Sequence, residues 1–329
     1  MNDASQSLTT RVEPLKTDAH IVLATFLADE PTLVQADGKI LVGADQLTPH
    51  GENAILVAAC DGTRLITGGD DGKIFLLTGK ETPREVGNEK GRWIDALALG
   101  PSQSLAWSTG KKVVARDGKG QLKEWTAPST AQGIAFAPKG YRLGIAHYNG
   151  ASFWFPNTEG IPEFREWKGS HLDITFSDDG RFTVTSMQEN TLHGWRLADG
   201  KDMRMSGYPS KTRSFSWSHD GNWLATSGAD AAIIWPFKDK DGPMGKAPRE
   251  CGVRHAKVSS VAFHPRALVV AIGYEDSCIL LCRLNDGAEL LVRPAAPAEG
   301  KITSMSWDRA GARMIFGTEE SSAGVLTLP

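Results

Sequence analysis

Cysteine is scarce in this chain of 329 residues, which contains only Cys60, Cys251, Cys278 and Cys282. No two of them form a CxxC pair, and their spacing does not match that of a zinc site. Because a cytosolic setting keeps thiols reduced, we expect no disulfide framework. The four residues are therefore predicted to be small buried apolar side chains in strands.

Long apolar runs are also missing. The longest, such as 269–272 and 279–282, fall far short of the roughly 20 residues that span a bilayer. The segment 1–16 has neither a positively charged n-region nor an apolar h-region, so we expect no secretory signal. These absences predict a cytoplasmic protein that does not enter a membrane.

No charge of either sign predominates, since 36 Lys and Arg stand against 39 Asp and Glu, for a formal net charge of -3. Binding to phosphate backbones depends on clustered Lys and Arg, and the chain contains no basic run. Nucleic acid is therefore not an expected partner.

Recognisable catalytic motifs are absent as well. The patterns GxSxG, HExxH and the P-loop do not occur. The eight histidines lack metal-ligand spacing along the sequence, although His147, His171 and His255 all lie near predicted strand ends that could face one mouth of the fold. We expect a protein that is not an enzyme and that uses no cofactor and no metal.

What the chain does contain is a repeat. Helical periodicity is missing, and a short apolar run that ends just before a turn recurs about every 40 residues. Such a period is typical of stacked or radially arranged supersecondary units. The anchor residues of these runs are Phe26, Ala59, Leu99, Phe136, Phe176, Trp217, Phe263 and Trp307.

Each repeat predicts four antiparallel strands. A turn with Gly or Asp follows the apolar run, as at 179–180, and two further short runs rich in β-branched and aromatic residues come next, as at 222–227 and 232–237. A more polar run, as at 163–169, precedes the next apolar run and is typical of an outer strand that faces water on one side. The fold class is therefore all-β, with four-stranded blades in the layout of a β-propeller.

The count of runs predicts eight blades, with seven as the alternative because the first unit has the shortest spacing. The polar run at 11–16 stands before the first complete unit, and the chain ends on the apolar run 325–328. We therefore expect the N-terminal strand to pair with the last one and to close the ring, which removes a free edge. Residues 1–10 are expected to be disordered, and residues 11–329 to form a single domain in a monomer.

These residues resemble the WD40 family. RHAKVSSVAFHP at 254–265 is similar to the family's Gly-His opening and first strand, and the segment 214–235 is similar to its consecutive strands. The Trp that closes the third strand is present as Trp154, Trp195 and Trp235, but Asp follows none of them. The resemblance implies a buried Asp-His-Ser/Thr-Trp network, which we expect to be incomplete in most blades.

The resemblance favours a non-catalytic scaffold or adaptor that binds proteins through one face. The alternative is an enzyme or a metal-handling accessory factor with a site at the channel mouth. In a propeller the loops before each first strand, and those between the second and third strands, gather on one face. Several residues there are of types enriched at interfaces. The predicted partner-binding face consists of Arg92, Trp93, Asp95, Gln132, His147, Tyr148, Met187, Arg213, Ser259, Tyr274, Glu275 and Thr303.

Overall fold

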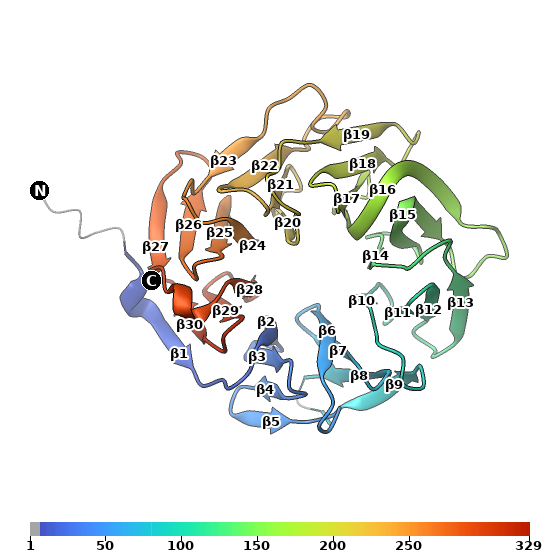
Figure 1. Cartoon of the computed structure of the whole chain (residues 1–329), viewed down its shortest axis with the longest axis horizontal. Coiled ribbons are helices and arrows are strands. Elements are labelled where there is room, and N and C mark those ends of the chain that lie inside the picture. The colour runs from blue at the N-terminus through green and yellow to red at the C-terminus, as the bar shows by residue number, and fades with distance from the viewer. Residues whose placement is uncertain (1–6, 80) are drawn as a thin grey trace, which may run out of the picture. The chain divides into compact units, whose positions relative to one another are not determined.

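The computed structural model describes residues 7–79 and 81–329, and nearly all of their regular structure is β-strand (Figure 1). Thirty strands and two short 3-10 helices are present in this part of the chain. The prediction of an all-β protein is confirmed. The strands group into two compact units, one of Met1–Thr48 with Thr212–Pro329 and one of Pro49–Lys211.

The first unit contains four antiparallel sheets of four strands each. Its strands are β2 (Ile21–Leu27), β3 (Glu30–Gln35), β4 (Ile40–Val42) and β5 (Asp45–Leu47); β20 (Phe215–Trp217), β21 (Trp223–Thr226), β22 (Ala232–Pro236) and β23 (Arg249–Cys251); β24 (Val258–Phe263), β25 (Val269–Tyr274), β26 (Ile279–Arg283) and β27 (Glu289–Arg293); and β28 (Ile302–Trp307), β29 (Arg313–Thr318) and β30 (Ala323–Thr327) with β1 (Val12–Leu15). The 3-10 helices are η1 (Thr9–Arg11) and η2 (Pro297–Glu299).

The second unit contains two sheets of four strands and one of six. Its strands are β6 (Ile55–Cys60), β7 (Arg64–Gly69), β8 (Lys73–Thr78) and β9 (Arg84–Asn88); β10 (Ala96–Leu99), β11 (Leu105–Thr109), β12 (Lys112–Arg116) and β13 (Leu122–Thr126); and β14 (Gly133–Phe136), β15 (Leu143–Trp154), β16 (Glu163–Phe176), β17 (Phe182–Met187), β18 (Leu192–Arg196) and β19 (Asp202–Met205).

The described residues therefore form seven sheets, and the prediction of eight separate ones is not supported. The two blades predicted around Phe136 and Phe176 share one strand, because β16 pairs with β15 over 163–170 and with β17 over 171–176. Gly169 has a φ of 133°, a conformation that favours glycine, so the strand changes direction there without ending. The sequence marks this place only by one glycine between a polar and an apolar run.

The N-terminal strand completes the last sheet, as predicted. β1 pairs antiparallel with β30, with Val12 opposite Leu326. The prediction of disorder over residues 1–10 is wrong for its last four residues, because Ser7 bridges to Leu291 of β27 and the Leu8 amide donates to the Leu291 carbonyl at 2.7 Å. Leu8 supplies the energetic reason, since its side chain packs into the core beside β27. Residues 1–6 lie outside the described residues.

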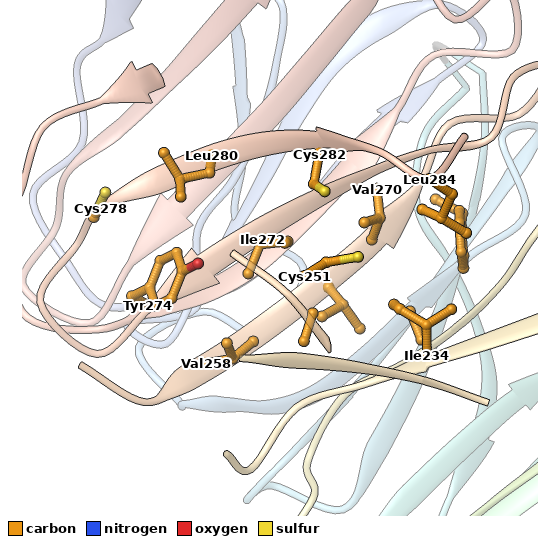
Figure 2. Close-up of a cluster of buried hydrophobic side chains, with 14 residues drawn as sticks. Ile234, Cys251, Val258, Val270, Ile272, Tyr274, Cys278, Leu280, Cys282 and Leu284 are labelled. Carbon is orange, nitrogen blue, oxygen red and sulfur yellow. The ribbon is translucent and has the colours of Figure 1, made fainter. Parts of the chain in front are cut away.

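Apolar side chains fill the space between successive sheets. Figure 2 shows one such cluster in the first unit, which includes Ile234 of β22, Ile272 of β25 and Leu280 of β26. Cys251 and Cys282 lie in the same cluster, and both are buried. Burial raises the pKa of the Cys278 thiol, which keeps it protonated. These three cysteines are core side chains, whereas Cys60 is half-buried.

No helix in residues 7–79 and 81–329 is long and apolar enough to cross a membrane.

Candidate functional site

The candidate site is one edge of the second unit, where loops between strands display two aromatic side chains. Its first part is the loop between β9 and β10, which holds Trp93. Backbone bonds fix this loop on the β7–β8 turn: the Glu89 amide donates to the Gly72 carbonyl at 2.8 Å, and the Ile94 amide donates to the Gly69 carbonyl at 3.3 Å. The Ile94 side chain is buried beneath, so Trp93 is 67% exposed on a firmly anchored loop.

Gly72 shows how closely this loop and turn pack. A Cβ atom at this position would meet the Gly91 nitrogen at 2.8 Å and the Arg92 carbonyl oxygen at 2.9 Å. Gly72 also has a φ of 76°, which glycine adopts without strain. The backbone that carries Arg92 and Trp93 is therefore in contact with the turn below it.

A series of hydrogen bonds extends the edge from Trp93 to Tyr148. The Gly110 amide, in the β11–β12 turn, donates to the Asp95 carboxylate at 2.5 Å. The Ala131 amide of the next loop donates to the Gly110 carbonyl at 2.8 Å. The Tyr148 amide then donates to Ser129 Oγ in the same loop at 2.8 Å. The β9–β10 loop, the β11–β12 turn, the β13–β14 loop and the turn at Tyr148 are thus joined into one surface.

The structure places five of the predicted residues of this unit on that surface. Trp93 and Tyr148 are 67% and 54% exposed, and Arg92, Asp95 and Gln132 are exposed as well. Trp93 projects from its loop and does not pack beneath it. These five residues are accessible to a partner.

His147 and Met187, predicted in the same set, are buried and cannot contact a partner. His147 is the last inward-facing residue before the turn within β15, and its Nε2 lies 2.9 Å from Ser152 Oγ. Met187 ends β17 in the same way, with its side chain packed inward. Their assignment to the binding face is corrected: each immediately precedes an exposed residue, Tyr148 or Gln188.

The first unit holds the other five predicted residues. Arg213 and Glu275 are exposed. Ser259 and Thr303 are half-buried and join neighbouring sheets: Ser259 Oγ donates to the Ile302 carbonyl at 2.7 Å, and Thr303 Oγ1 donates to the Ile21 carbonyl at 2.7 Å. Their hydroxyl groups thus stabilise sheet packing.

Tyr274 is the third predicted residue that the structure corrects. Its side chain is fully buried, and its hydroxyl donates to the Gly252 carbonyl. Burial raises the pKa of the phenol, because the apolar surroundings disfavour its charged form. Tyr274 is therefore a core residue.

The buried histidines have structural partners. His50 Nδ1 lies 3.1 Å from the Asp71 carboxylate and its Nε2 lies 3.0 Å from Thr67 Oγ1, while the Phe75 ring packs edge-on against the imidazole with centroids 4.8 Å apart. His171 Nδ1 lies 2.7 Å from Thr185 Oγ1. Burial lowers the pKa of both rings, so they are neutral at pH 7.

The ring nitrogens of His147 and His171 are thus occupied by protein partners. In residues 7–79 and 81–329, no group of three or more His, Cys, Asp or Glu side chains is placed to hold a metal ion.

Sequence reasoning missed two basic residues of the edge, Lys90 and Lys111, both exposed. Lys90 precedes Gly91 in the Trp93 loop, and Lys111 follows Gly110 in the β11–β12 turn. Their positions beside turn glycines were the signal that could have found them.

Comparison with known proteins agrees with this architecture. The family model described as "WD domain, G-beta repeat" matches residues 203–235. The crystal structure of the C-terminal WD40 domain of Sif2 aligns with a TM-score of 0.76 over 97% of this chain and 98% of that one, at 12% identity. The chain has the fold of a WD40-repeat β-propeller, and one of its segments matches the WD40 repeat.

Curated relatives of this WD40 chain are much longer proteins. Telomerase protein component 1 of Rattus norvegicus is 25% identical over 261 residues, which cover 72% of the chain and 10% of the relative. A subunit of chromatin assembly factor 1 from Gallus gallus is 42% identical over 89 residues, which cover 25% of the chain and 15% of the relative. The WD40 chain thus spans a small part of the length of either relative.

Proposed function

We propose that this WD40 chain, with residues 11–329 acting as one domain, is a non-catalytic scaffold or adaptor in the cytoplasm. It binds a protein partner through the edge of the second unit that carries Trp93 and Tyr148. The observation that carries the proposal is the exposure of Trp93, because Trp and Tyr exposed on rigid surfaces are the residue types that dominate binding energy at protein interfaces.

The setting of Trp93 supports a binding role. A large aromatic side chain is usually buried, and Trp107 and Trp195 of the same unit are 1% and 2% exposed. The backbone around Trp93 is fixed by its hydrogen bonds to the β7–β8 turn, so little conformational entropy of this loop is lost when a partner binds. Both conditions suit a preformed contact surface.

The names of two relatives agree with this proposal. One is called a component of telomerase and the other a subunit of a chromatin assembly factor, so both are named as parts of larger assemblies. WD40 propellers in general bind proteins, and a protein is the partner proposed for this chain.

The proposal is tested by removing the two exposed aromatic side chains. A Trp93→Ala/Tyr148→Ala variant is compared with an Ile161→Ala/Leu122→Ala variant, which removes two exposed apolar side chains elsewhere in the same unit. Proteins that co-purify with each chain from its own cells are quantified by mass spectrometry. We expect a specific partner to be lost from the first variant and retained by the second. Retention of every partner by the first variant contradicts the proposal.

A further inference from the structure

The charges along the Trp93–Tyr148 edge are unbalanced in a way that specifies a partner. The edge is formed by residues 88–95, 108–112, 127–132 and 146–149, which are held together by hydrogen bonds between their loops. These segments contain four basic residues and two carboxylates. The basic residues are Lys90, Arg92, Lys111 and Lys112, and the carboxylates are Glu89 and Asp95.

Both carboxylates are already occupied. Glu89 accepts the indole N–H of Trp107 at 2.7 Å and pairs with Lys112 at 3.1 Å. The Asp95 carboxylate accepts the Gly110 amide at 2.5 Å.

The carboxylates of the β7–β8 turn, beneath the Trp93 loop, are occupied in the same way. The Asp70 carboxylate accepts the Ala54 amide at 3.0 Å, and Asp71 contacts His50 and accepts the Lys73 amide at 2.9 Å. The carboxylates near the edge therefore already bind groups of the chain itself.

Three basic side chains remain without an acidic partner. Lys90, Arg92 and Lys111 are exposed, and no carboxylate of the described residues lies within ion-pair distance of any of them. They flank Trp93 on its own loop and on the adjoining turn. We call Lys90, Arg92, Trp93, Lys111 and Tyr148 the basic aromatic edge.

We propose that the basic aromatic edge binds an acidic peptide segment of its protein partner, with apolar side chains of that segment on Trp93 and Tyr148. The inference rests on the proposed scaffold function and adds the chemistry of the partner. Unpaired cations attract carboxylates and steer association, while the exposed aromatic rings supply contact area. A Trp beside cations suits a peptide with alternating acidic and apolar residues, which offers both kinds of contact.

A peptide fits this edge better than a nucleic acid does. Three unpaired cations on one loop and one adjoining turn form no continuous basic groove that could follow a phosphate backbone.

The test measures binding of a short synthetic peptide of Asp, Glu and Leu to the full chain by fluorescence anisotropy. The Lys90→Gln/Arg92→Gln/Lys111→Gln variant removes the three cations. The Lys119→Gln/Lys123→Gln/Lys139→Gln variant is the matched control, since it removes three exposed lysines of the same unit. We expect the first variant to bind roughly tenfold more weakly and the control to bind as the wild type does. Added salt should weaken wild-type binding.

Several outcomes overturn the inference. These are failure of the wild type to bind the acidic peptide, equal loss in the two variants, and tighter binding of a Lys and Leu peptide or of a single-stranded oligonucleotide. If the acidic peptide fails while a native partner still depends on Trp93 and Tyr148, this inference is wrong and the scaffold proposal stands. If native partners still bind the Trp93→Ala/Tyr148→Ala variant, the scaffold proposal itself is wrong.

Discussion

The indole of Trp167 lies almost parallel to the imidazole of His193, with ring centroids 3.8 Å apart. His193 is fully buried, and neither of its ring nitrogens makes a hydrogen bond in the described residues. The nearest carboxylate is that of Asp202, at 3.7 Å. Burial, together with the charges of His171 and Arg204, lowers the pKa of His193 to about 3.

Acid should therefore destabilise the fold through His193. In the unfolded chain this ring binds a proton near its ordinary pKa of 6.5, whereas in the folded chain it does so only near 3. Between these values the unfolded state binds more protons, so the free energy of unfolding falls as the pH falls. Between pH 7 and pH 5 the loss due to His193 should be about 2 kcal/mol.

Substitution isolates this contribution. His193→Phe keeps a flat ring against Trp167 and cannot be protonated, so its unfolding free energy should fall less between pH 7 and pH 5 than that of the wild type. Urea titrations at the two pH values provide the measurement, and His219→Gln, at an exposed histidine, is the control. Identical pH dependence in the wild type and His193→Phe contradicts the assignment.

Trp235 and Trp93 should differ sharply in their contribution to stability. Trp235 is 7% exposed in β22, so its replacement by Ala should lower the unfolding free energy by about 3–5 kcal/mol. Trp93→Ala is the matched control, because loss of an exposed side chain should cost about 0.5 kcal/mol or less. Equal midpoints of denaturation for the two variants would show that one of these placements is wrong.

Glu89 connects the core to the candidate site. Because its carboxylate accepts the N–H of the buried Trp107 indole, Glu89→Ala should leave that donor unpaired and cost about 1–3 kcal/mol. Glu89→Gln retains an acceptor oxygen and should cost less. Thermal denaturation of the two variants gives the comparison. A smaller loss for Ala than for Gln would contradict this role.

The β1–β30 pairing should stabilise the first unit. Removal of residues 1–17 eliminates the apolar contacts of Leu8, Val12 and Leu15 and leaves β30 with a free edge. The unfolding free energy should fall by about 3 kcal/mol or more. Removal of residues 1–6 alone, which keeps the pairing, is the control. If the longer deletion has the same denaturation midpoint as the full chain, the pairing does not contribute.

The repeat pattern predicted most of the fold because turn residues bound each run of four to seven residues. It missed the continuity of β16, where Gly169 passes the chain from one pairing partner to the next. A glycine there predicts a turn as readily as a bend, and only the pairing with β15 and β17 decides between them.

The sequence predicted which turns carry the candidate site, but it did not predict which side chains at those turns point outward. The sequence assigned His147, Met187 and Tyr274 to the binding face, yet each of them is buried and the residue that follows it is exposed. Successive side chains of a strand point to opposite sides, so a shift of one residue exchanges core and surface. The register that decides this is set by pairing between strands.

The most direct test of the scaffold account is site-specific photo-crosslinking in the native cell. A photoreactive phenylalanine analogue is placed at position 93 in one chain and at position 161 in another, since Ile161 is 96% exposed and lies outside the basic aromatic edge. The account predicts that a specific protein partner is crosslinked from position 93 and not from position 161. Crosslinking of the same partner from position 161 alone would contradict it.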